Sequence, residues 1–401
     1  MAYTPSLKPN TRIEVADILR GIAIGGIVLI HFIEQLNFYK FPPASSEFMA
    51  SLNQTVWDSL FFMLASKMYA IFSMLFGLSF FIQMDNQADK GVDFRLRFLW
   101  RMALLFVLGY VNGLMYMGEF FVVYAVLGCV MVLLWRVPTK ILLVVALILF
   151  LQIPEWVSLG KMLMGVAPNE RSEMAKYMGS LYVECADIFA NQGFWDMIRF
   201  NLWKGQLAKC LWVIAVARYL QLIGLFIIGM LIGRKGIHRS EENMVKWSKK
   251  ALPWALGVFA LFYGASLLLP ALGLEGFALG RARMLLRNYA NLGQMIFYVS
   301  GLTLLYYKSK GWRGVLDKLA PVGRMSVTNY MVQSALGVIV FYGFGLNMAM
   351  TATFAECALA GVVICVAQII FSNWWMKRYY YGPVEWLWRT ATWMKRVPLK
   401  R

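Results

Sequence analysis

Long apolar runs recur along the whole chain and constrain its fold more than any other feature. Ten of them are long enough to cross a bilayer, and they cover residues 17–36, 57–84, 97–117, 119–135, 139–160, 209–233, 252–271, 286–307, 320–345 and 352–376. The chain has 401 residues, of which 60% are hydrophobic and only 15% are charged. A soluble domain cannot bury so much apolar side chain. The sequence therefore predicts an all-α, polytopic transmembrane helix bundle with about ten membrane spans.

Most of the positive charge lies between these runs rather than within them. The formal net charge is +18, and most of the 39 lysine and arginine residues flank the spans on the side that carries both termini. By the positive-inside rule, both termini are cytoplasmic, which agrees with an even number of spans. We expect a multi-pass protein of a bacterial inner (plasma) membrane, with membrane lipids as partners. No soluble basic domain is present to bind nucleic acid.

The chain divides into one membrane domain with two attached segments. Residues 1–401 are expected to form a single integral-membrane domain. Residues 161–208, the only long external connection, have mixed apolar and charged faces, which favours an amphipathic cover segment between spans five and six. A separate binding domain is the alternative. Residues 377–401 form a basic, aromatic cytoplasmic tail whose tryptophans suit an interfacial anchor.

The first apolar run carries charges that a bilayer disfavours. Asp17, Arg20, His31 and Glu34 all lie within or beside it. Arg20 and His31 are eleven residues, or three helical turns, apart, so they share one face and lie ~16 Å apart along the axis. Ionisable groups in a span usually face a protein interior or a wet cavity, so each is a candidate functional residue. The chain has only one other histidine, His238, which lies in a charged loop.

Further polar residues cluster where the third and fourth spans meet. Asn112, Glu119 and Tyr124 fall near the external side, at the level of His31. A glutamate at a helix start is often a cap or a dipole partner. The alternative is that Glu119 faces His31 across an internal cavity.

Two later spans also carry polar faces. The eighth has Arg283, Arg287 and Asn291 at helical spacing. These residues, with Arg281, either snorkel to lipid headgroups or form an anion-binding face. The ninth contains polar residues too numerous for a lipid-facing helix: Arg324, Ser326, Thr328, Asn329, Tyr330, Gln333 and Ser334. Its hydroxyl groups suit hydrogen bonds between helices, whereas the arginine and the two amides are candidates for ligand binding.

Several familiar catalytic patterns are absent from the sequence. The five cysteines have no metal-ligand spacing, so we expect no metal site. The chain has no glycine-rich phosphate loop, no HExxH and no GxSxG. Metal, ATP and serine-hydrolase mechanisms therefore lose support.

Four segments in order carry a family resemblance over nearly the whole length. They are DILRGIAIGGIVLIHF, RLRFLWRMALLFVLGYVNGLMYMGEFFVVYA, GRMSVTNYMVQS and GPVEWLWR. Together they resemble the YeiB-like bacterial membrane proteins, also known as domain of unknown function 418. The first helix is also similar to that of a wider group of membrane acyltransferases, which includes the acyltransferase type 3 and heparan glucosaminide N-acetyltransferase proteins. In type 3 members an arginine and a histidine separated by ten residues mark this helix, as Arg20 and His31 do here.

The chain also departs from the YeiB-like pattern. Those relatives often have histidine where Asn112 stands and aspartate where Glu119 stands, and the end of their first helix is frequently asparagine. Here the imidazole lies on the first helix instead of the third. A catalytic residue shared across the family is therefore in doubt.

The resemblance implies an acyl-CoA-dependent transmembrane acyltransferase that modifies an external sugar or lipid-headgroup acceptor. In this hypothesis acyl-CoA is the co-substrate, and His31 deprotonates the acceptor. Glu34 or Glu119 orients the imidazole, and Arg20 and Arg324 hold the donor. The remaining candidates contact the substrate: Asn112, Tyr124, Arg283, Arg287, Asn291, Asn329 and Gln333. Two alternatives stay open: a transporter or flippase for an amphipathic anion, and a non-catalytic membrane protein whose charges form a structural ion-pair network.

Overall fold

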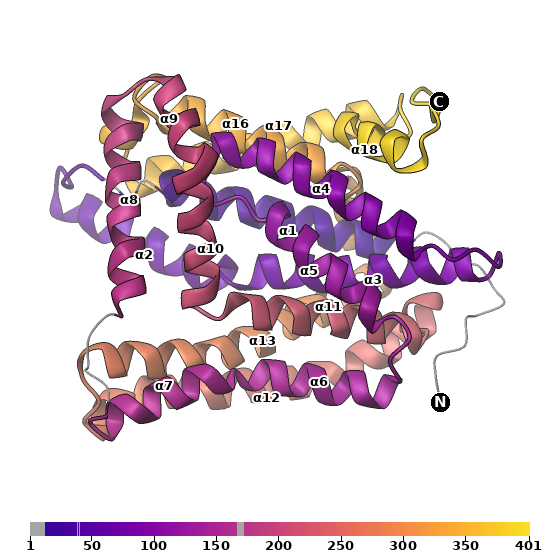
Figure 1. The fold of residues 1–401 in the computed structure, drawn as a ribbon, viewed down its shortest axis with the longest axis horizontal. Helices are drawn as coiled ribbons and strands as arrows, with labels where there is room; N and C mark the ends of the chain where they lie inside the picture. Colours follow the sequence, from indigo (N-terminus) through magenta and orange to yellow (C-terminus); the bar gives the residue numbers. More distant parts are fainter. Residues whose placement is uncertain (1–12, 38, 40, 167–171) are drawn as a thin grey trace.

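The described part of the chain is built from helices joined by short connections, as expected (Figure 1). The computed structural model describes residues 13–37, 39, 41–166 and 172–401. The helices of the first half are α1 (Glu14–Ile33), α2 (Glu47–Leu64), α3 (Lys67–Ala88), α4 (Arg95–Met115), α5 (Phe121–Leu134), α6 (Thr139–Leu151), α7 (Ile153–Leu163), α8 (Glu173–Asn191) and α9 (Phe194–Phe200). Those of the second half are α10 (Gln206–Ala215), α11 (Arg218–Arg234), α12 (Glu241–Leu268), α13 (Gly276–Lys308), α14 (Lys310–Leu316), α15 (Ala320–Arg324), α16 (Ser326–Phe341), α17 (Phe354–Met376) and α18 (Pro383–Trp393).

The protein is an all-α membrane protein, although its exact number of spans remains a prediction. Within the described residues, six helical segments are long and apolar enough to cross a bilayer, or seven if one bent pair counts as a span. The runs 119–135 and 320–345 correspond to the shorter apolar helices α5 and α16. The run 57–84 falls across a break between α2 and α3. Ten runs therefore coincide with helices, but fewer than ten meet the length and composition expected of a simple span.

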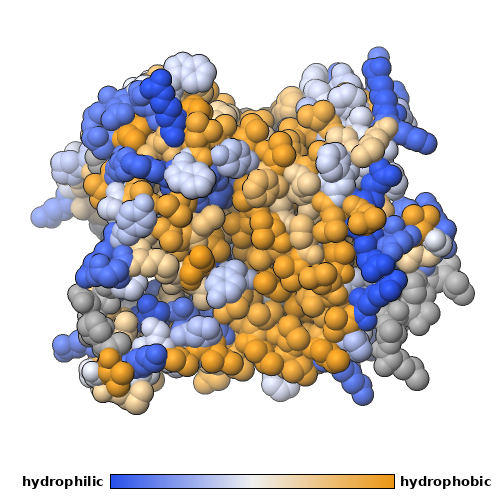
Figure 2. Space-filling view, viewed as in Figure 1, coloured by the Kyte–Doolittle hydropathy of each residue, from blue (hydrophilic) through white to orange (hydrophobic). Residues whose placement is uncertain are grey.

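The outer surface agrees with a membrane setting. Figure 2 shows a wide apolar belt across the middle of the molecule, with hydrophilic residues gathered at both ends of the long axis. Most helices run along this axis, whereas α8, α9 and α10 stand across it at one end (Figure 1). These transverse helices include most of the expected cover segment, of which residues 167–171 lie outside the described residues. The cover function itself remains a prediction.

Helix α1 lies in the interior, where it packs against α3, α15, α16 and α17. Its apolar face is fully buried at Ile24, Val28 and Phe32. Glycine permits the contact with α15, because a Cβ atom added to Gly323 would lie 1.8 Å from the backbone oxygen of Asp17. This close approach brings Arg324 beside the charged start of α1.

The run 209–233 is not a continuous span. Helices α10 and α11 are separated by Val216 and Ala217 and are bent by 74° relative to each other. Ala217 adopts the left-handed conformation with a φ of 48°. A broken helix places backbone polar groups at membrane depth, which is tolerated where they line a cavity or are buried in protein. The break also sets Arg218 at the first turn of α11.

The C-terminal tail docks onto the helix bundle. The Trp388 indole donates a hydrogen bond to the backbone oxygen of Arg101 on α4, at 3.0 Å. The Glu385 carboxylate accepts hydrogen bonds from the backbone N–H groups of Val327 and Thr328, at 2.7 and 3.0 Å. Because these N–H groups lie in the first turn of α16, Glu385 satisfies donors that the helix itself leaves unpaired. The tryptophan-rich tail is thus packed against the helix bundle through α4 and α16.

Candidate functional site

Two cavities within the bundle divide the charges of α1 between them. The first, which we call the His31 cavity, has a volume of about 430 Å³ and is lined by His31, Glu34, Lys209 and Arg218 among others. The second, the Arg20 cavity, has a volume of about 710 Å³ and contains Arg20 and three further arginines in its lining. Three side chains line both cavities, namely Phe72, Phe121 and Tyr124. Together these three side chains form a shared wall between the two spaces.

His31 is held by an amide and two aromatic rings. Its Nδ1 atom lies 3.4 Å from Nε2 of Gln333, which projects from α16 and is fully buried. The ring centroid lies 4.9 Å from that of Tyr116 and 6.0 Å from that of Tyr330. These neighbours fix the imidazole at the edge of the cavity. The structure thus brings together His31 and Gln333, two residues singled out from the sequence.

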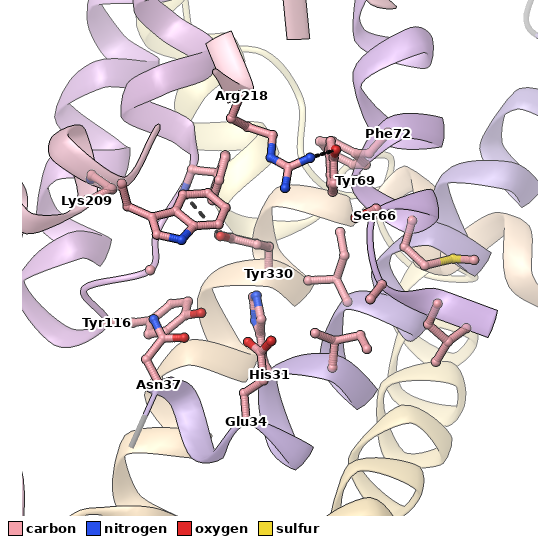
Figure 3. Close-up of a pocket in the computed structure, with 18 of the residues that line it drawn as sticks. His31, Glu34, Asn37, Ser66, Tyr69, Phe72, Tyr116, Lys209, Arg218 and Tyr330 are labelled. Carbon is pink, nitrogen blue, oxygen red and sulfur yellow. Dashed lines mark hydrogen bonds between the residues drawn. The ribbon is translucent and has the colours of Figure 1, made fainter. Parts of the chain in front are cut away.

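Glu34 lies beside His31 on the same wall of the cavity (Figure 3). It follows Ile33, the last residue of the α1 span. Burial raises the pKa of its carboxyl to about 7, and a hydrogen bond with Tyr39 opposes this shift in part. The carboxyl therefore changes charge near neutral pH in a space that also contains an imidazole.

The opposite wall carries Arg218, a cation within the apolar run 209–233 that is not among the predicted site residues (Figure 3). Its guanidinium donates hydrogen bonds to the Tyr69 hydroxyl and, at 2.7 Å, to Oε1 of Gln221. It also lies 4.6 Å from the ring centroid of Tyr69 and 5.4 Å from that of Trp212. The guanidinium is thus fixed in orientation by neutral groups.

Glu119 contacts a lysine instead of the histidine. Its Oε2 lies 3.5 Å from Nζ of Lys209, and both side chains are buried. The same carboxylate accepts hydrogen bonds from the backbone N–H groups of Phe121 and, at 3.3 Å, Val122. Glu119 therefore caps the start of α5 and neutralises Lys209. This geometry favours the capping interpretation over a direct contact with His31.

The Arg20 cavity combines four cations with aromatic rings. Arg20 pairs with Asp17 at 2.8 Å and donates to the Ser79 hydroxyl at 2.5 Å. Arg324 lies 3.4 Å from the second Asp17 oxygen. Arg101 and Arg389 complete the set, and their positive charges repel each other. Among the described residues, two carboxylates, Asp17 and Glu385, line this cavity beside the four arginines, so its wall is positively charged.

The tail contributes much of the aromatic surface of this cavity. Trp388 on α18 carries the Arg101 guanidinium over its ring at 3.7 Å from the centroid. Tyr380, Tyr381 and Trp393 line the same space. Cations above planar rings and further exposed aromatic faces suit a ligand that has both phosphate groups and a flat ring system.

The shared wall is ordered by hydrogen bonds from α3. The Tyr124 hydroxyl lies 2.6 Å from the Ser73 hydroxyl and 3.3 Å from the backbone oxygen of Tyr69. The Phe121 ring packs 4.5 Å from that of Tyr330, which itself neighbours His31. Tyr124, predicted from the sequence, therefore stands between the two cavities instead of in one of them.

Other residues chosen from the sequence serve packing or lie elsewhere. Asn112 donates to the Ser334 hydroxyl at 3.3 Å, and Asn329 donates to Val322 O and Ser372 Oγ at 3.2 and 3.0 Å. Neither asparagine lines a cavity described above. Both amides are buried and their side-chain nitrogens bond to neighbouring helices, which indicates a structural function for each.

The arginine face of α13 is not brought to either cavity. Arg283, Arg287 and Asn291 are absent from both linings, because α13 packs mainly against α12. Arg287 lies over the Tyr263 ring of α12, and Arg281 pairs with Glu155 of α7. These residues therefore line neither cavity, and whether the face binds an anion or meets lipid headgroups stays a prediction.

Comparisons with known proteins agree with this architecture. Residues 232–395 match a family described as "Protein of unknown function (DUF418)", and residues 12–168 match "Heparan-alpha-glucosaminide N-acetyltransferase, catalytic". The first match contains Arg324, Gln333 and most of the tail, whereas the second contains Arg20 and His31. Both cavities are thus built from both matched parts. No solved structure matches the chain.

Full-length relatives are found in several bacteria. The uncharacterized protein YxaH of Bacillus subtilis is 29% identical, over 99% of this chain and 98% of its own length. An uncharacterized 39.9 kDa protein of Bacillus acidopullulyticus is 24% identical over 97% of this chain and 96% of its own, and the uncharacterized protein YeiB of Escherichia coli is 26% identical over 94% and 95%. The fold is that of a polytopic α-helical membrane protein, and residues 12–168 are similar to an acetyltransferase catalytic family. By these matches the chain is similar to the YeiB-like proteins and to the domain of unknown function 418.

Proposed function

We propose that this protein is an acyl-CoA-dependent acyltransferase of a bacterial plasma membrane. The observation that carries the proposal is the pair of cavities that meet at the wall formed by Phe72, Phe121 and Tyr124. One cavity is rich in arginine and the other contains the histidine. The match of residues 12–168 to an acetyltransferase catalytic family supports the same class of reaction.

The donor would bind in the Arg20 cavity, on the side predicted to be cytoplasmic. Guanidinium groups bind phosphate through paired hydrogen bonds, and the repulsion between Arg101 and Arg389 would be relieved by an anion. Arg20 and Arg324 are already oriented by Asp17. The thioester end of acyl-CoA would then approach the shared wall, while the nucleotide stays among the arginines.

The acceptor, a sugar or lipid headgroup, would enter the His31 cavity from the external side. His31 would take the proton from an acceptor hydroxyl or amine as the oxygen or nitrogen attacks the thioester carbonyl. The new bond forms to the carbonyl carbon, the carbon–sulfur bond breaks, and the CoA thiolate leaves. The proton held by His31 passes to solvent or to the departing thiolate. The acyl transfer therefore needs acyl-CoA and the acceptor, and no further cofactor.

One observation favours a second function, transport of an amphipathic anion. Discontinuous helices at membrane depth are common in transporters, and α10 and α11 form such a broken pair. The His31 and Arg20 cavities would then be two binding sites along one transport pathway, and no acyl transfer would occur. The broken helix is equally suited to lining a substrate cavity, so chemistry must be measured directly.

The two functions are separated by a doubly labelled donor. Proteoliposomes that contain the purified protein receive acetyl-CoA with one label on the acetyl group and another on the CoA moiety. An acyltransferase releases CoA on the donor side and transfers only the acetyl label to the acceptor. A transporter moves both labels together across the membrane. Equal movement of both labels would refute the enzymatic proposal.

A further inference from the structure

Arg218 is a half-buried cation at the break between α10 and α11, and its identified partners are neutral. Its guanidinium hydrogen-bonds to the Tyr69 hydroxyl and the Gln221 amide oxygen. Within the described residues it forms no ion pair, and its buried Nε atom has no hydrogen-bond partner. A charge removed from water is costly unless it is paired. The arrangement therefore leaves a positive charge and a donor available.

The position of Arg218 directs this charge into a cavity. It is the first residue of α11, a helix of 17 residues that begins after the break at Ala217. Both the side chain and the positive end of the helix dipole favour an anion at this point. The guanidinium lines the His31 cavity on the wall opposite His31 and Glu34 (Figure 3). A ligand there would lie between an anion-binding group and a general base.

The second cation of the cavity does not duplicate this function. Lys209 is buried against Glu119 at 3.5 Å and also donates to Gln206 at 2.7 Å. Its charge is therefore already compensated, whereas that of Arg218 is not. Tyr69 and Trp212 flank the Arg218 guanidinium, which restricts its rotation before any ligand arrives. A fixed guanidinium loses little entropy when it forms hydrogen bonds.

We propose that Arg218 is the binding group for an oxyanion of the acceptor, a phosphate or a carboxylate carried close to the hydroxyl or amine that His31 deprotonates. This inference rests on the proposed function for the identity of the ligand as an acceptor, but the anion site itself follows from Arg218 and its cavity. The acceptor is thus an anionic sugar derivative or an anionic lipid headgroup.

Binding of matched probes to the purified full-length protein tests the proposal. Isothermal titration compares glucose with glucose 6-phosphate and glucuronate, and dihexanoylglycerol with dihexanoyl phosphatidic acid. At least one anionic probe should bind more tightly than its neutral counterpart. If the preference appears among the sugars, the acceptor is an anionic sugar; if it appears among the lipids, the acceptor is an anionic lipid headgroup. Arg218→Gln should weaken that binding about tenfold or more, because a charge-assisted pair is lost.

Two further variants separate binding from folding. Arg218→Lys keeps the charge but not the planar fork, and should show intermediate affinity. Arg199→Gln removes an exposed arginine of α9 that lines neither cavity and should bind as the wild type does. Thermal unfolding of each variant checks that the bundle is intact. Two results would overturn the proposal: wild-type affinity for the anionic probe in both Arg218→Gln and Arg218→Lys, or no anionic probe that binds more tightly than its neutral counterpart. In either case Arg218 has only a structural function at the break between α10 and α11.

The same samples distinguish failure of this inference from failure of the proposed function. Acetyl-CoA is titrated separately, since its expected site is the Arg20 cavity. Absence of acetyl-CoA binding and of thiol release by the wild type would refute the acyltransferase. A preference for the anionic probe that depends on Arg218 would still stand in that case. Conversely, acyl transfer to a neutral acceptor without any anionic preference would refute only the assignment of Arg218.

Discussion

The side-chain amide of Gln333 lies 3.4 Å from Nδ1 of His31, and this contact joins α16 to the charged face of α1. The hydrogen on an imidazole occupies one ring nitrogen at neutral charge, and the partner of the other determines which. A general base at Nε2 requires hydrogen on Nδ1. A half-turn of the Gln333 amide places Oε1 there to accept that hydrogen. It also gives a hydrogen bond to Oε1, which has no hydrogen-bond partner among the described residues.

Gln333→Ala should therefore lower kcat about tenfold with little change in KM, because one buried hydrogen bond that orients the base is lost. Gln333→Glu should retain more activity, since a carboxylate also accepts from Nδ1–H. Steady-state acyl transfer by the two variants gives both constants. Wild-type kcat in Gln333→Ala would show that the amide does not position the imidazole.

Glu34 predicts a pH dependence of anion binding. The pKa of its carboxyl is about 7, raised by burial, and the groups around it are His31, Tyr39, Tyr116 and Tyr182. Above this pH the carboxylate adds a negative charge opposite Arg218, so affinity for an anionic probe should fall as pH rises through 7. Glu34→Gln should bind the probe with a flatter pH profile. Titration of the anionic probe from pH 5.5 to 8.5 provides the comparison, at roughly the range where such a carboxyl changes charge.

The same carboxyl also affects stability, with a defined sign. Its folded pKa of about 7 exceeds the ordinary value of 4.5, so the folded state holds the proton more tightly. The stabilising contribution of Glu34 is full below its unfolded pKa and is lost as pH rises towards 7. The thermal midpoint of the wild type should decline over this interval more than that of Glu34→Gln. Parallel declines would contradict the assignment to Glu34.

Phe72 predicts how the shared wall limits the acyl group. It lines both cavities, whereas Phe76, one turn further along α3, lines only the Arg20 cavity. Phe72→Ala should widen the passage and raise the turnover of octanoyl-CoA relative to acetyl-CoA about tenfold. Phe76→Ala is the matched control and should change this ratio much less. An unchanged ratio in Phe72→Ala would mean that the acyl group does not pass this wall.

Gly323 predicts the cost of separating α1 from α15. A Cβ atom there would lie 1.8 Å from Asp17 O, so Gly323→Ala forces the two helices apart. Overpacking of this kind costs about 1–3 kcal/mol of stability, and displacement of Arg324 should also weaken acetyl-CoA binding. Gly160→Ala, which meets no atom within 4 Å, should instead be neutral or stabilising by up to about 1 kcal/mol. Thermal unfolding and acetyl-CoA titration of both variants test this pair.

The charged face of α1 could be predicted from the sequence because it depends only on helical periodicity. Arg20 and His31 do lie on one helix and reach separate cavities. The apolar runs likewise coincide with helices, since hydrophobicity over about twenty residues is a local property. Local signals did not reveal the break at Ala217, which depends on how α10 and α11 pack in three dimensions.

The opposing walls of the cavities could not be predicted, because they depend on how helices that are distant in sequence pack together. Arg218 lies inside the apolar run 209–233, and this signal could have nominated it, but it was not among the predicted site residues. Arg101 and Arg389 lay among residues expected to flank the membrane, and only the docking of α18 onto α4 brings them together. Conversely, the polar spacing on α13 predicted a ligand face, but tertiary packing directs that helix towards α12.

The most direct test of the central claim compares the two histidines of the chain during acyl transfer. His31 lines a cavity, whereas His238 lines neither and packs beside Phe81, with ring centroids 6.0 Å apart. Thiol release from acetyl-CoA by the purified protein, with an anionic acceptor present, should fall about 100-fold or more in His31→Ala. It should stay near the wild-type rate in His238→Ala. Equal rates in His31→Ala and the wild type would contradict the account.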